Sequence, residues 1–321
     1  MRTPVSTGMA AAAAAATLWG VGTIATAAVL RTGVPPGPFT VIELVSSVAF
    51  LVVLCRVTAT PLPSIRRRWR AGALGLLEPG ATYLLVNLGL ARTSATHGAL
   101  IGAAEPILIA LIAWAVLGEA ISRRLVAPMA LVLLGTIAVV TAHSTTQGSS
   151  WSGDGLVALG ILSAAFYVVG SSRVVADIPV LGLTLLQQIF ALGLVVPVVA
   201  LAELTGVSAL AGGSGPGPVS LWPWVAVPLI GVGASSLTFL LYLTALRHIA
   251  AGVAAQFLAL VPLVAFTGAV LVLDEPAGLQ AVVGAAVVVV ALLVIARIEQ
   301  RNGLAARPSD PTVGADLGGH P

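Results

Sequence analysis

The chain consists of long apolar runs separated by short segments rich in Pro, Gly and Arg. A helix needs about 20 residues to cross roughly 30 Å of hydrocarbon, so each run predicts one transmembrane helix. Most runs are apolar on every side, which favours contact with lipid over packing of one stripe on a soluble core. The predicted spans are 9–30, 38–55, 71–91, 95–117, 125–142, 155–175, 180–203, 221–246, 249–273 and 277–296.

The composition leads to the same conclusion. Hydrophobic residues make up 58% of the chain and charged residues 8%, and the mean hydropathy is +1.06. These values exclude an ordinary soluble globule and a disordered chain. A single cysteine, Cys55, excludes an internal disulfide or a thiolate metal cluster. We therefore predict an all-α membrane protein with ten transmembrane helices. The first run continues to Leu30 and is longer than the apolar stretch of a secretory signal, which is about 7 to 15 residues. We therefore interpret the first run as a membrane span and not as a secretory signal.

The basic residues are all Arg, and their placement predicts the orientation. With a cytoplasmic N-terminus, only Arg31 and Arg92 of the 15 fall on the outer side. Positive residues gather on the cytoplasmic side of membrane proteins, so this split predicts an even number of spans with both termini cytoplasmic. We expect a multi-pass protein of the cytoplasmic membrane. The formal charge of +3 is too small to indicate a nucleic-acid partner.

The chain also contains an internal repeat. Residues 90–119 align without a gap with residues 246–275, and the match pairs Pro106 with Pro262. Five predicted helices separate the two copies, so the second copy must be threaded through the membrane in the opposite direction. Inverted repeats of this kind surround a midplane site in many secondary transporters. The expected parts are a cytoplasmic N-terminus (1–8), a first five-helix repeat (9–142), a linker (143–154), a second five-helix repeat (155–297) and a disordered cytoplasmic tail (298–321).

Several short motifs give a family resemblance. They are Leu18-Trp19-Gly20, Glu105-Pro106, Leu117-Gly118-Glu119 and, in the second repeat, Pro262 and Asp274-Glu275. Together with the helix count, they make the chain resemble EamA-type members of the drug/metabolite transporter superfamily over roughly residues 9–297. The resemblance implies a cavity lined by helices 1, 3, 4, 6, 8 and 9, with helices 5 and 10 peripheral. Glu43 departs from the family pattern, because many members carry Arg near that place.

Glu105 is the first candidate site residue. It lies about ten residues into the fourth predicted helix, hence ~15 Å deep and near the bilayer midplane. A carboxylate at that depth must pair, face water or take up a proton, and the last two suit substrate contact or coupling. The alternative is a protonated Glu that is hydrogen-bonded to a neighbouring helix. We also expect Pro106 to free a backbone carbonyl near Ile101 and Gly102.

Other polar groups lie at membrane depth. Glu78 in the third helix precedes Pro79 as Glu105 precedes Pro106, although its side chain could instead extend toward the arginines of the preceding loop. Tyr83 and Asn87 share a face of the same helix and could bond either a substrate or a neighbouring helix. Trp19 could stack on a planar or cationic ligand, or simply pack. Polar amides in the seventh and ninth helices, with interhelical bonding as the alternative role, are Gln187, Gln188 and Gln256.

The remaining titratable residues suggest no catalytic or metal chemistry. Glu43 and Glu203 are placed near the outer ends of their helices and are expected to be solvated. Glu119 and Glu275 open the next helices, where the helix dipole favours a negative charge. The four histidines (His97, His143, His248 and His320) show no ligand spacing, so no metal site is expected. The chain has no Lys for a phosphate loop, and we expect no cofactor.

These observations favour a secondary active transporter of small metabolites, amino-acid-like compounds or drugs that works by alternating access. Export is the expected direction and the proton the expected coupling ion. The expected partners are a small-molecule substrate, membrane lipid and protons, with the chain a monomer or a homodimer. The alternatives are an intramembrane enzyme and a non-transporting membrane sensor or scaffold. For an enzyme, Ser235 and Ser236 lack a histidine at matching depth.

Overall fold

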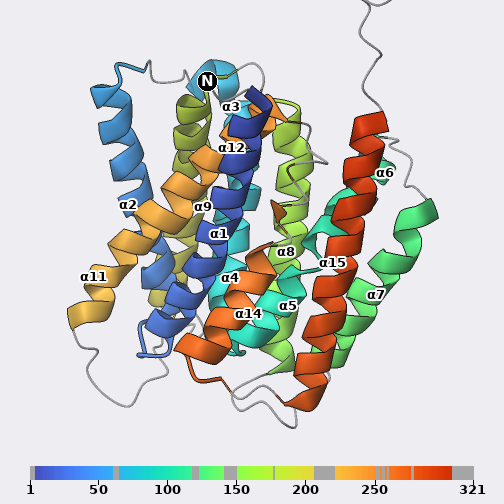
Figure 1. Ribbon diagram of the computed structural model, residues 1–321. Helices are drawn as coiled ribbons and strands as arrows, with labels where there is room; N and C mark the ends of the chain where they lie inside the picture. The colour runs from blue at the N-terminus through green and yellow to red at the C-terminus, as the bar shows by residue number, and fades with distance from the viewer. Residues whose placement is uncertain are drawn as a thin grey trace, which may run out of the picture.

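A computed structural model describes residues 4–60, 65–117, 123–140, 150–175, 178–205, 221–249, 254, 257–258, 260–275 and 278–305. Every regular element within these residues is a helix, which agrees with the expected all-α class. The helices run roughly side by side between two faces (Figure 1). The first helix of the chain begins at the upper face in this view.

The first half of the chain forms five helical segments, two of which are interrupted. Its third helix contains a π-helical turn, and its fourth contains a break at Ala103 and Ala104. The elements are α1 (Pro4–Leu30), α2 (Pro36–Val57), α3 (Ile65–Gly75) with η1 (Leu76–Ala81) and α4 (Thr82–Leu90), α5 (Ala95–Gly102) with α6 (Glu105–Leu117), and α7 (Arg123–Val140).

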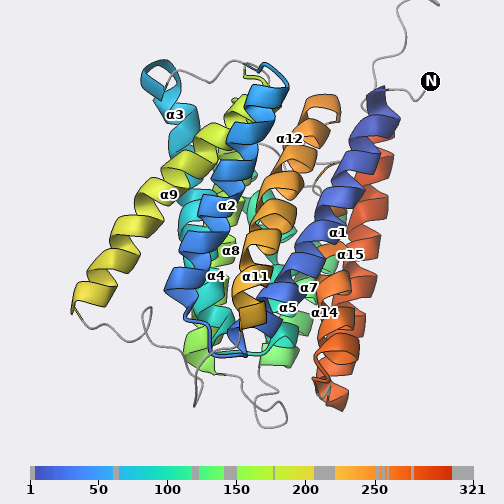
Figure 2. The ribbon, with the colours of Figure 1, turned by 90° about the vertical axis from the view of Figure 1, so that its left-hand side faces the viewer.

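The second half follows the same plan. Its third helix again contains a π-helical turn. The elements are α8 (Trp151–Ser172), α9 (Val180–Thr205), α11 (Leu221–Ile230) with η3 (Gly231–Leu237) and α12 (Thr238–His248), α14 (Leu260–Val272), and α15 (Leu279–Ala305). Helix α8 begins four residues before the expected span at 155. Figure 2 shows α9, α2, α12 and α1 side by side across one face of the bundle.

Seven helices among the described residues are long and apolar enough to cross a bilayer. They fall in seven of the ten predicted spans. The spans predicted at 249–273 and 277–296 contain shorter apolar stretches, Leu260–Val272 and Val282–Ala291. The span predicted at 125–142 contains α7, which has 18 residues. The structure therefore supports the arrangement of ten segments and gives full membrane-spanning length to seven of them.

Contacts at the helix ends show that the two halves are inverted. Arg31, one residue beyond α1, pairs with Glu275. Glu275 also accepts a hydrogen bond from the N–H of Ala95, at the start of α5. Just before α5, Thr93 donates to Asp154, in the first turn of α8. The end of α1 and the beginning of α8 therefore lie on the same face, at the bottom of Figure 1. The first helices of the two halves run in opposite directions.

The π-helical turns extend the repeat at the same spacing of 156 residues. Thr82 donates to the carbonyl of Leu77 at 2.9 Å in η1, and Thr238 donates to the carbonyl of Gly233 at 3.0 Å in η3. Each bond reaches back five residues and satisfies a carbonyl that the wider turn leaves available. The same side chain thus stabilises the same irregular turn in both halves.

A glycine precedes or opens each π-helical turn and permits close helix packing. A Cβ on Gly75 would lie 1.9 Å from the backbone oxygen of Gln187 in α9. A Cβ on Gly231 would lie 2.3 Å from the backbone oxygen of Glu43 in α2. No side chain fits at either distance, so glycine is required for the third helix of each half to contact the second helix of the other.

The fifth helices of the two halves, α7 and α15, pack against each other along one edge of the molecule (Figure 1). Met129 and Val132 on α7 form a buried cluster with Ala285 and Val288 on α15. A Cβ on Gly135 would lie 2.9 Å from the backbone oxygen of Gly284. This pair is peripheral, as the family resemblance implies.

The packing predicts that Gly231→Ala destabilises the protein. The new methyl group forces α2 and η3 apart, and overpacking of this kind costs about 1–3 kcal/mol. Gly233→Ala is the matched control in the same turn, because a Cβ there meets nothing within 4 Å. Cys55 is a buried, free cysteine, so thermal unfolding in detergent can be followed with a thiol-reactive dye. Equal unfolding temperatures for the two variants would contradict this interpretation.

Candidate functional site

A cavity lies between the two halves of the chain. It contains about 720 Å³ of space that protein atoms do not fill, and part of this space is open to the surroundings of the protein. Both halves line it, through the helix segments that the family resemblance implies and through α2 in addition. The lining residues are Trp19, Gly22, Thr23, Thr26, Glu43, Glu78, Thr82, Tyr83, Val86, Asn87, Leu90, Glu105, Ile161, Ala164, Ala234 and Val261.

Five of the eight candidate residues from the sequence lie in this lining. They are Trp19, Glu78, Tyr83, Asn87 and Glu105. Gln256 lies outside the described residues. The two carboxyl groups that depth in the membrane singled out are therefore brought into one cavity from two different helices.

Glu78 is held by the interruption of the third helix. Within η1 its backbone is extended, with φ −143° and ψ 128°, so the residue departs from the helical path. Its exposed fraction is only 6%, and the side chain faces the cavity. Among the described residues, its Oε2 atom has no hydrogen-bond partner. A buried carboxyl oxygen without a partner is costly, so this atom is available to a proton or to a ligand.

Glu105 begins α6 after the break at Ala103 and Ala104. Its side chain is half-buried, and it lies near enough to Glu78 for the two carboxyls to interact electrostatically. The break also changes the role of Pro106. Because the helix starts anew at Glu105, Pro106 lies in the first turn, where no N–H is required. Of the two residues near which a free carbonyl was expected, Ile101 does not provide one, because its oxygen accepts a hydrogen bond from the N–H of Ala104 at 3.0 Å.

The expectation of a solvated Glu43 is also wrong. The side chain is only 3% exposed and lies in the cavity wall. Its Oε1 atom accepts from the Ser235 hydroxyl at 2.8 Å, and its Oε2 atom accepts from Asn87 Nδ2 at 3.3 Å. The Asn87 amide donates to Thr40 Oγ1 as well, at 2.9 Å. Glu43 therefore joins α2 and α4 of the first half to η3 of the second.

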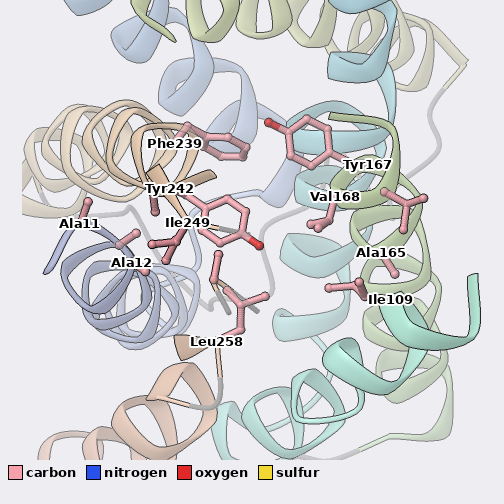
Figure 3. Close-up of a cluster of buried hydrophobic side chains, with 14 of the residues drawn as sticks. Ala11, Ala12, Ile109, Ala165, Tyr167, Val168, Phe239, Tyr242, Ile249 and Leu258 are labelled. Atoms are coloured by element: carbon pink, nitrogen blue, oxygen red, sulfur yellow. The ribbon is translucent and has the colours of Figure 1, made fainter. Parts of the chain in front are cut away.

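A cluster of aromatic rings includes two residues of the cavity lining, Trp19 and Tyr83. Trp19 packs against Phe239 and Tyr242, with ring centroids 5.4 and 5.3 Å apart. Tyr83 lies 6.2 Å from Phe239, its repeat equivalent, and its hydroxyl donates to the carbonyl of Ala234 at 3.3 Å. Phe239 also packs against Tyr167, with ring centroids 5.8 Å apart. Figure 3 shows how these two rings approach one another from α12 and α8.

The glutamines of the seventh predicted helix join helices together. Tyr167 donates to Gln187 Oε1 at 2.9 Å, and Gln187 Nε2 donates to Ser171 at 3.3 Å. Gln188 donates to the backbone oxygen of Ser235 at 3.3 Å. Neither amide lies in the cavity wall. The structure therefore favours interhelical bonding for this pair over contact with a substrate.

Glu275 joins the two halves at the face where α1 ends. Its oxygens accept the N–H groups of Ala95 and Thr96, both at 2.8 Å, and it pairs with Arg31. Arg31 also donates to the carbonyl of Leu273 at 3.2 Å. The expectation that Glu275 serves the helix after it is wrong, because its contacts are with the N-terminus of α5. We name this group of Arg31, Glu275 and the two N–H groups the Arg31–Glu275 clamp. Glu119 lies outside the described residues.

Comparison with known proteins agrees with this architecture. A sequence profile described as the EamA-like transporter family matches residues 6–141 and 151–297. The chain belongs to the EamA-like transporter family. The two matched segments are the two halves of the EamA fold described above, and the family is one of drug/metabolite transporters. No curated protein sequence matches the chain significantly.

The EamA fold is also seen among solved structures. One, titled only "Crystal structure of protein", superposes with a TM-score of 0.64 at 20% sequence identity. The match covers 92% of this chain and 99% of that chain. At this identity the likeness shows a shared fold and carries no information about substrate.

The Arg31–Glu275 clamp predicts that Glu275→Ala lowers stability. Loss of the carboxylate leaves two N–H groups of α5 uncapped, which costs about 0.5–2 kcal/mol. Glu275→Gln keeps one acceptor and should have a smaller effect. Glu203→Ala removes the same charge from an exposed position on α9 and serves as the control. The measurement is the unfolding temperature in detergent, and an equal shift for Glu275→Ala and Glu203→Ala would argue against the clamp.

Proposed function

We propose that this EamA protein is a secondary transporter that moves a small organic solute across the cytoplasmic membrane by alternating access. The observation that carries the proposal is the cavity, which contains Glu78 and Glu105 and is walled by elements of both inverted halves. A site shared by two inverted halves can face either side of the membrane when their packing changes.

Proton coupling is part of this proposal. Glu78 and Glu105 line the same cavity and interact electrostatically, so a negative charge on one disfavours a negative charge on the other. Binding of a substrate that replaces a proton on one of them would link the two movements. Because the proton and the substrate would replace each other at one site, proton entry would drive export of the substrate.

A membrane enzyme is the competing class. Ser235 and Ser236 would be its candidate nucleophiles, but both hydroxyls are engaged. Ser235 donates to Glu43, and Ser236 bonds to Ser47 at 2.7 Å. The geometry of these hydroxyls supports helix packing, and transport therefore remains the better proposal.

The proposal predicts that Glu105→Gln reduces transport driven by a pH gradient at least about tenfold. The neutral amide keeps the shape but cannot exchange a proton. Uptake of radiolabelled candidate solutes into proteoliposomes, with and without an imposed gradient, measures this. Glu203→Gln is the control, since its exposed side chain is remote from the cavity lining. If the gradient has no effect on the wild type and Glu105→Gln transports at the same rate, the coupling proposal fails.

Alternating access predicts that the cavity is reached from the outer side more readily when the Arg31–Glu275 clamp is weakened. Thr26 lines the cavity and is only 6% exposed, so Thr26→Cys in a Cys55→Ser background provides a reporter. We expect a membrane-impermeant maleimide to label it several-fold faster from the outside in Glu275→Ala than in the parent. Unchanged labelling would contradict a role for the clamp in closing that face.

A further inference from the structure

The charged residues that line the cavity are all acidic. Three of its lining residues are acidic, namely Glu43, Glu78 and Glu105, and none of the described lining residues is Arg or His. Two Arg side chains near the ends of lining elements are engaged elsewhere. Arg31 pairs with Glu275, and Arg247 donates to the carbonyls of Val175 and Ile178. A ligand in the cavity therefore meets negative or neutral groups.

The three carboxyls are not equivalent. Both oxygens of Glu43 accept hydrogen bonds from protein donors, so this group is occupied in holding helices together. Glu78 is buried to more than nine-tenths, faces the same cavity and has an oxygen without a partner among the described residues. That unpartnered oxygen marks the place where a donor from outside the protein is missing. The Glu78 carboxyl also interacts electrostatically with Glu105.

Six further lining residues are aromatic or aliphatic and suit an apolar body, beside polar groups from three Thr and Asn87. Trp19 and Tyr83 present aromatic rings, and Val86, Leu90, Ile161 and Val261 present aliphatic groups. Aromatic faces attract cations, especially where water is excluded. An ammonium group near the carboxyls and a hydrophobic body along this wall would satisfy both parts of the surface.

We infer that the transported solute is a monovalent organic ammonium ion with an aromatic or branched aliphatic body. This inference rests on the proposed transport function and narrows its substrate class. Its ammonium group donates to Glu78 and Glu105, and its body lies against Trp19 and Tyr83. Amino acids are poorer ligands, because their own carboxylate would be buried beside three acidic groups with no cationic partner.

Four probes that share one ring and differ in charge test this inference. They are phenethylamine (cation), L-phenylalanine (zwitterion), 3-phenylpropionate (anion) and 2-phenylethanol (neutral). Isothermal titration calorimetry on the full chain in detergent, at fixed pH, gives their dissociation constants. We expect phenethylamine to bind at least about tenfold more tightly than each of the others. The corresponding aliphatic series, isoamylamine, L-leucine, 4-methylpentanoate and isoamyl alcohol, should follow the same order.

Variants then assign the binding groups. Glu78→Gln and Glu105→Gln should each weaken phenethylamine binding about tenfold or more and leave 2-phenylethanol unaffected, whereas Glu203→Gln should change neither. Equal or tighter binding of the zwitterion or the anion would overturn the inference. No amine binding at millimolar concentration would also overturn it, and so would unchanged amine binding in both variants. The charge series on the wild type keeps the test valid even if a variant fails to fold.

The test of the ligand class can be separated from the test of the proposed transport function. Counterflow of radiolabelled amine in proteoliposomes needs no imposed gradient. If the amine binds selectively but shows no counterflow, transport fails while the assignment of the ligand class stands. If counterflow occurs with L-phenylalanine and not with phenethylamine, transport stands and the ammonium inference fails.

Discussion

In hydrocarbon, every backbone N–H and C=O group must find its partner within the protein, so a helix can be interrupted at depth only where protein or water surrounds the break. The interruptions in this chain obey that constraint. Glu78 in η1, Ala234 in η3 and Glu105 after the break in the fourth helix all border the cavity. The carbonyl of Leu77, at the first interruption, accepts from Thr82 and also from Ser163. The interruptions of the helices are therefore found where the helices border the cavity.

The scaffold is nearly symmetric, whereas its chemistry is not. At the spacing of 156 residues, Glu78 corresponds to Ala234 and Glu105 to Val261, and all four line the cavity. The first half contributes the carboxyls and the second half contributes small or apolar groups at the equivalent places. Inverted packing thus provides the enclosure, and substitution within one half provides the polarity. The acidic groups of the lining therefore all come from one half of the chain.

Sequence reasoning reached the parts of the structure that depend on local pattern. The 20-residue apolar runs, the internal repeat and the positions of Glu78 and Glu105 well inside their helical segments follow from periodicity and helix rise, which need no knowledge of neighbours. Glu43 was misjudged because α2 begins at Pro36, which places the carboxyl further along the helix, and because its partner Ser235 is 192 residues away. Similarly, Glu275 could be placed at a helix end, but pairing across 180 residues with Ala95 is a property of the inverted packing.

Two glycines each pack against the backbone of a helix from the other half of the chain. Gly75 ties the third helix of the first half to α9, and Gly231 ties the third helix of the second half to α2. Each tie crosses from one half of the sequence to the other. In the transport cycle proposed above, a helix packed this closely on a helix of the other half would move with it. Each moving body would then contain helices from both halves, so the bodies would not coincide with the two repeats of the sequence.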